Sequence, residues 1–193
     1  MNNTINNLSF KANLRTLTKI KNKSAFSEVN DLFKKSTKYY KDDVLLITKT
    51  NLGENVLQLS HLEKGIYKDY INADVVVKDI NKQIDTIGAS KLSQKFVSIY
   101  KALKAHEKAV SDINGIKIEL SRAKSLLNLN QSISYAWASE GKEHIAKRYD
   151  VLAQKNTERI EFLTKKLNTF VKEFNKKIDK LCSNYSELEQ LKI

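Results

Sequence analysis

The sequence predicts a mainly α protein. It would consist of a long antiparallel, coiled-coil-like helical hairpin, a third helix and a small N-terminal β-α-β-β unit. From Lys91 to Leu188, apolar residues recur at steps of three and four, which places them on one stripe of a helix. The 193 residues include no proline and only five glycines, so few positions break a helix. We therefore expect a small α+β unit in residues 1–60 and an elongated helical bundle or hairpin in residues 61–193.

The first 60 residues show the pattern of a strand, a helix and two further strands. Apolar and polar residues alternate over 8–14, which is typical of a strand with one buried face. Ser24 is the expected N-cap of the helix. The apolar run 44–47 predicts a buried strand, 51–55 a turn, and 56–59 the returning strand. If the first two strands are parallel, the helix between them makes the crossover.

A third helix is predicted after this unit. Ser60 and Glu63 match the capping-box pattern, so the helix would run from His61 or Leu62 to about Ile87. Three consecutive β-branched residues, Val75 to Val77, weaken its helix propensity. Gly88 is expected to end it.

The hairpin would have a first arm over 91–128 and a second arm over 143–190. Residues 129–142 are read either as the hairpin tip or as a continuation of the first arm. In the second arm, the step from Leu152 to Ile160 breaks the heptad, with Asn156 at the expected core position. The lysines of both arms, such as Lys104, are expected on the face opposite the stripe, in water.

No catalytic, cofactor or metal signature is present, so we expect a protein that is not an enzyme and needs no cofactor. The three histidines do not have the spacing of zinc ligands, and Cys182 is the only cysteine. Phosphate-binding glycine loops and nucleophile elbows are also absent from the sequence. Asp42 and Asp43 are expected to be a solvated strand flank.

The net charge of +12 suits nucleic acid, an anionic membrane or an acidic partner. Its densest part is the lysine- and tyrosine-rich region between residues 19 and 41. Aromatic residues between the arms could supply a second contact point. The candidate interaction residues are Lys19, Lys21, Lys23, Lys34, Lys35, Lys38, Tyr39, Tyr40, Tyr135 and Trp137.

We expect a non-enzymatic helical protein–protein interaction protein of a bacterium or phage, acting as an adaptor, inhibitor or scaffold. Its contact surface would lie at the ends of the hairpin. The expected partner is another protein, and a homodimer would cover seam surface that arms of unequal length leave open.

Two alternatives belong to other functional classes. One is a basic nucleic-acid-associated protein that uses the lysine-rich N-terminal face. The other is a secreted effector or membrane-active protein that uses the segment 133–138. Membrane contact would not involve spanning, because no apolar run approaches the ~20 residues of a transmembrane helix. Without a recognisable signal peptide we expect a cytoplasmic location, or export by a specialised secretion system without a cleaved signal.

Overall fold

The computed structural model describes residues 12–37, 43–63 and 66–193. Along the chain the elements are β1 (Asn13–Thr16), α1 (Lys23–Ser36), β2 (Asp43–Lys49), β3 (Asn55–Glu63), β4 (Ile66–Val77), α2 (Ile80–Ser139), α3 (Glu143–Cys182) and the 3-10 helix η1 (Ser186–Leu191). The chain forms two compact units, which we describe separately. Unit 1 comprises residues 1–107 and 178–192, and unit 2 comprises residues 108–177 with Ile193. The mainly α fold class with a small N-terminal β unit is thus confirmed.

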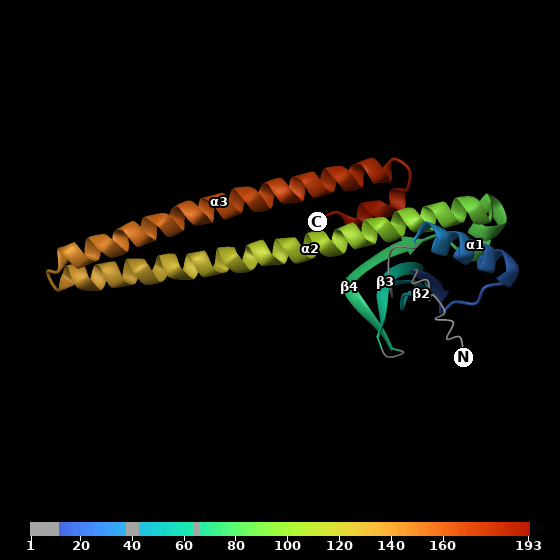
Figure 1. Cartoon of the computed structure of the whole chain (residues 1–193), viewed down its shortest axis with the longest axis horizontal. Coiled ribbons are helices and arrows are strands. Elements are labelled where there is room, and N and C mark those ends of the chain that lie inside the picture. Colours follow the sequence, from blue (N-terminus) through green and yellow to red (C-terminus); the bar gives the residue numbers. More distant parts are fainter. Residues whose placement is uncertain (1–11, 38–42, 64–65) are drawn as a thin grey trace, which may run out of the picture. The chain divides into compact units, whose positions relative to one another are not determined.

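Unit 1 is built on a four-stranded sheet in the order β1-β2-β3-β4 (Figure 1). β1 pairs with β2 in parallel through α1, which confirms the predicted crossover, and the other pairs are antiparallel. Residues 43–47 of the interior strand β2 are buried without alternation, because both faces of the strand are covered. The continuous apolar run in the sequence was therefore a correct sign of a buried strand.

The start of the chain follows the predicted pattern, except that the N-cap of the first helix lies two residues earlier than predicted. Ala12 and Leu14 are buried, as the alternation requires, while positions 8–11 lie outside the described residues. α1 is capped by Asn22 and not by Ser24. The Asn22 side chain accepts a hydrogen bond from the Ala25 amide at 3.0 Å, which satisfies one of the unpaired donors of the first turn.

The predicted helix over 61–87 is wrong for most of its length. Residues up to Glu63 continue β3, and 66–77 form β4, which pairs with β3. The three valines 75–77 sit opposite residues 55–57, where β-branched side chains are favoured. Helix begins only at Ile80, and Gly88 interrupts it as expected, with φ 76° and ψ 162°. The expected domain boundary at residue 60 falls inside β3.

Both edge strands of the sheet are capped by side-chain amides. On β1, the Leu14 amide donates to Asn30 Oδ1 at 3.1 Å. On β4, the Val76 amide donates to Gln190 Oε1 at 3.0 Å, and Gln190 Nε2 donates to the Val76 carbonyl at 3.4 Å. These bonds satisfy backbone groups that would otherwise be available to another strand.

A buried polar cluster lies where α2 crosses the start of β2. Tyr100, which packs edge-on against Phe33, donates to Asp43 Oδ2 at 2.5 Å. Lys104 Nζ lies 3.3 Å from that carboxylate and 3.2 Å from Glu107. Burial lowers the pKa of Lys104, but the two carboxylates outweigh it, so the pKa is raised overall. Two expectations were therefore wrong: Asp43 is buried, and Lys104 is half-buried and ion-paired.

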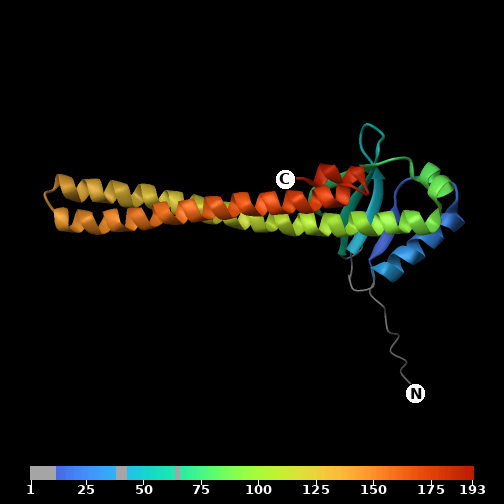
Figure 2. The same cartoon turned by 90° about the horizontal axis from the view of Figure 1, so that it is seen from above.

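Unit 2 is the antiparallel hairpin made by the adjoining parts of α2 and α3, which run side by side in Figure 1 and in Figure 2. The segment 129–139 continues the first arm, which settles the alternative left open by the sequence. The turn follows at Gly141, whose φ is 72°. The second arm was predicted to reach Gln190, but α3 ends at Cys182 and η1 follows.

The hairpin seam keeps one heptad register throughout unit 2. Ala153 is only 7% exposed and occupies the seam, whereas Leu152 is 44% exposed beside it. The predicted break between Leu152 and Ile160 is therefore wrong, because the smaller residue takes the seam position. The buried or half-buried seam residues are Ile113, Ile116, Leu120, Ala123, Leu127, Asn130 and Ser134 in α2, and Ala146, Tyr149, Ala153, Asn156, Ile160, Leu163 and Leu167 in α3.

Candidate functional site

The basic loop before α1 and the first residue of that helix present three exposed lysines, Lys19, Lys21 and Lys23. The backbone of the loop is held by Asn81, whose Nδ2 donates to the Lys19 carbonyl at 3.2 Å and whose Oδ1 accepts from the Lys21 amide at 2.8 Å. This gives the loop a fixed path with its ammonium groups in solvent.

The remaining predicted basic residues are not gathered at that loop. Lys34 is half-buried and Lys35 exposed, both in the last turn of α1. Lys34 follows Lys23 by eleven residues, or about 16 Å along a helix axis. Lys38, Tyr39 and Tyr40 lie outside the described residues. The described lysines of this region therefore form two groups at opposite ends of α1.

The two aromatic candidates of unit 2 have different environments. Tyr135 is 78% exposed. Trp137 is half-buried, and Lys142 Nζ lies 4.4 Å from its ring centroid, within cation–π distance. The ring of Trp137 is thus partly covered from within unit 2.

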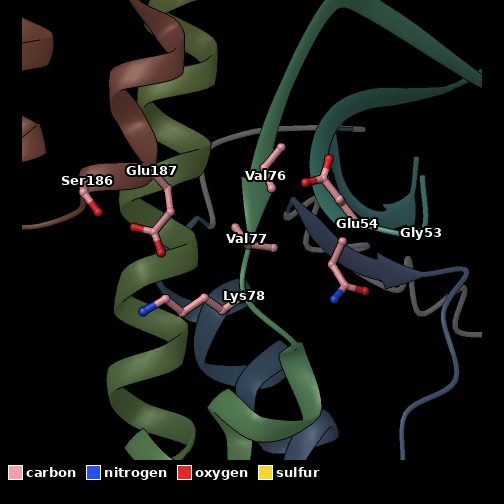
Figure 3. A pocket seen from close by; sticks show the side chains of 8 residues that line it. Gly53, Glu54, Val76, Val77, Lys78, Ser186 and Glu187 are labelled. Carbon is pink, nitrogen blue, oxygen red and sulfur yellow. The ribbon is translucent and has the colours of Figure 1, made fainter. Parts of the chain in front are cut away.

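A shallow pocket in unit 1, of about 400 Å³, is lined by residues of the β3 and β4 ends and of η1 (Figure 3). Lys78 and Glu187 extend into the same space there. Glu187 is bound by Lys95 at 2.6 Å, and Lys95 also donates to Gln83 at 3.0 Å. Burial raises the pKa of Glu187, but the hydrogen bond from Lys95 and the charges of Lys95 and Lys78 lower it overall. The carboxylate therefore stays ionised, and its negative charge is already balanced by lysines within the fold.

Two kinds of site are not found in the part of the chain that the structure describes. There is no group of three or more His, Cys, Asp or Glu side chains able to hold a metal ion. No described helix is long and apolar enough to cross a membrane.

Unit 2 presents large apolar side chains on one side of its seam. Leu126 and Leu152 immediately precede the seam residues Leu127 and Ala153. Glu119 and Arg159 hold equivalent positions one heptad away, and Arg159 Nη2 bonds Glu119 Oε2 at 3.3 Å. That bond shows that these positions of the two helices lie on the same side, as expected for an antiparallel pair.

Leu129 and Phe162 extend this surface outward. Each follows a seam residue by two positions, which places it next to the same side of the hairpin. Leu129 is 53% exposed and Phe162 is 65% exposed. Together with Leu126 and Leu152 they form an apolar strip over both helices, in which Lys155 and Arg159 separate Leu152 from Phe162 along α3.

The other side of the hairpin is polar. It is marked by the bond from Ser134 Oγ to Asp150 Oδ1 at 2.6 Å. Tyr135 is the one strongly exposed large apolar or aromatic side chain on that side among the described residues of unit 2. Ile118 and Val151, also exposed, lie on the outermost faces of their helices. The positions flanking the seam on this side are occupied by Lys117, Lys124, Gln131, Asp150, Thr157 and Thr164.

A small groove interrupts the apolar strip. It has a volume of about 140 Å³ and lies where the seam holds the short side chains Ala123 and Asn156. A cavity of about 150 Å³ accommodates a benzene molecule, so this groove fits one large apolar side chain. Its rim consists of Glu119, Arg122, Leu126 and Arg159.

Cations border the strip at the same heptad position as Leu129 and Phe162. Arg122, Arg148 and Lys155 are exposed, and within the described residues none of them forms an ion pair. We call this surface the apolar–basic face. It consists of Leu126, Leu129, Leu152, Phe162, Arg122, Arg148 and Lys155.

None of these seven residues was a predicted site residue. The sequence pattern placed Leu152 in the seam and predicted that the lysines of the arms are solvated. The signal in the sequence is the register: once Ala153 is placed in the seam, Leu126 and Leu152 fall beside the seam on the same side.

No protein-family model, curated protein or solved structure matches the chain.

Proposed function

We propose that this protein is a non-enzymatic protein–protein interaction protein that presents the apolar–basic face of unit 2 to a partner. The observation that supports the proposal most is the one-sided distribution of exposed apolar side chains. A hairpin that merely failed to cover its apolar residues would expose them on both sides of the seam. Contiguous exposed apolar surface rimmed by polar groups is typical of interaction sites.

The composition of the seam supports the same function. Ala123, Asn130, Ala153 and Asn156 occupy positions where a self-sufficient hairpin would place leucine. The larger Leu126 and Leu152 lie beside the seam, where a third element would bury them. Each such side chain contributes about 1.5–3 kcal/mol when fully buried.

This surface lies along the arm, whereas the sequence suggested contacts at the ends of the hairpin. Tyr135, an end residue, lies on the other side of the seam and serves as a matched control. Like Phe162, it is an exposed aromatic residue of unit 2.

The test is affinity purification of the tagged full-length chain from its source organism with quantitative mass spectrometry. Wild type, Phe162→Glu and Tyr135→Glu are compared. We expect at least one protein to be lost from the Phe162→Glu sample and retained with Tyr135→Glu. Identical protein sets for all three chains would rule out the apolar–basic face as the contact surface.

A further inference from the structure

We infer that the partner element is an acidic amphipathic α-helix, which lies lengthwise on the apolar–basic face. This inference rests on the proposed function and specifies the chemistry of the partner. It corresponds to the helix-in-groove mode of recognition, in which apolar side chains at helical spacing enter a groove between two helices.

The dimensions of the face suit a short helix. On α3 the apolar strip extends from Leu152 to Phe162, or about 15 Å along the axis. The groove at Ala123 and Asn156 lies between these two ends and has room for one large side chain. A partner helix of about three turns spans this distance, with its central apolar residue in the groove and one residue packed near each end.

The charge of the face selects acidic flanks for that helix. Arg122, Arg148 and Lys155 border the strip, and Glu119 is already bound to Arg159. Glutamates beside the apolar stripe of a partner helix would meet these cations and speed association at low salt.

The same features disfavour two other occupants. A second copy of unit 2 would bring the same cations against one another on a face whose charge is mainly positive. Lipid–water interfaces are enriched in Trp and Tyr side chains, and the apolar–basic face contains neither.

The probes are three fluorescent 18-residue peptides of equal length, tested with the full-length protein by fluorescence anisotropy. One is amphipathic with leucines on one stripe and glutamates elsewhere. The second is a scrambled version of the first, and the third carries lysines in place of the glutamates. We expect the acidic amphipathic peptide to bind at least tenfold more tightly than either control peptide.

The variants locate that binding on the structure. Phe162→Glu and the double variant Arg122→Glu/Lys155→Glu should each weaken it at least tenfold, while Tyr135→Glu should change it less than twofold. All substituted side chains are exposed, and unchanged helical circular dichroism verifies folding. The charge-reversal variant should also prefer the lysine peptide, which loss of structure would not produce.

Several results would overturn the inference. One is that the acidic amphipathic peptide does not bind. Another is that the scrambled or lysine peptide binds the wild type as tightly as the acidic amphipathic peptide does. A third is that the acidic amphipathic peptide binds Phe162→Glu as tightly as wild type. Wild-type dimerisation abolished by Phe162→Glu would assign the face to a second copy. Binding to phosphatidylglycerol vesicles lost in that variant would assign it to a membrane. If purified partners depend on Phe162 but no peptide binds, only the helix assignment fails; if none depends on it, the proposed function fails.

Discussion

Glu187 shows how one side chain ties the fold of unit 1 to pH. It belongs to η1, yet its carboxylate is bound by Lys95 of α2, 92 residues earlier in the chain. Its pKa is lowered in the folded state, whereas an unfolded glutamate titrates at about 4.3. Between these two values the unfolded chain binds more protons than the folded one, so acid favours unfolding.

Replacement of Glu187 by glutamine should therefore flatten the pH dependence of stability. The contribution of the carboxylate is present above about pH 4.3 and is lost as the pH falls through the folded pKa. We expect the free energy of unfolding, measured in urea from pH 7 to pH 3, to fall more steeply for wild type than for Glu187→Gln. Exposed Glu158→Gln is the control and should follow wild type. Parallel curves for wild type and Glu187→Gln would contradict this role of Lys95.

At the scale of an element, the seam register decides which leucines stabilise the hairpin. The heptad places Leu163 in the seam, where it is buried, and Leu152 beside it. These two leucines of one helix therefore contribute differently to the free energy of unfolding.

Alanine substitutions measure that difference. Leu163→Ala should destabilise the protein by about 2–5 kcal/mol, because it removes buried methyl groups and leaves a cavity. Leu152→Ala should cost less than about 1 kcal/mol, because its side chain already meets water and contributes little burial. Thermal unfolding followed by circular dichroism gives both values. Equal losses would show that Leu152 shares the seam.

The sequence predicted those elements whose pattern is local. Residues 44–47 form an unbroken apolar run, and the arms of the hairpin repeat at helical spacing, so both were recognised. β4 was missed because its strand character depends on pairing with β3, while its apolar residues also fit a helical stripe. The burial of Asp43 depends on Tyr100, 57 residues away, which no local pattern reveals.

The apolar–basic face was missed for a related reason. Leu152 and Ala153 are neighbours, and either is compatible with the stripe when size alone is considered. If the larger residue, Leu152, occupies the seam, the register shifts and the residues of the apolar strip no longer fall on one side. The face becomes visible only after the two helices are placed against each other.

At the scale of the whole chain, unit 1 is assembled from two stretches that flank unit 2. Its sheet and the start of α2 precede residues 108–177, while η1 follows them. η1 contributes the buried Leu188 and Leu191, and His106 Nδ1 lies 2.8 Å from the Leu191 carbonyl. The unfolded chain must therefore close a long loop before unit 1 is complete.

Shortening that loop should stabilise unit 1. When residues 108–177 are replaced by a flexible linker of about ten residues, the entropic cost of closing the loop should fall by roughly 1–2 kcal/mol. We expect this shortened chain to fold cooperatively, with a higher free energy of unfolding in urea. A control with a 70-residue glycine–serine linker should lose that gain. Failure of both chains to fold would show that unit 1 depends on unit 2.

The hydrogen bonds between Gln190 and Val76 of β4 can form only late in the synthesis of the chain. Val76 and Gln190 are separated by 114 residues. At about 5–20 residues per second, a ribosome needs about 6–23 s to synthesise that interval. Throughout it, the outer backbone groups of Val76 lack the side chain that covers them in the finished protein. Each nascent chain therefore passes through a period in which a neighbouring strand, from the same polysome or a chaperone, can pair with β4 before Gln190 emerges.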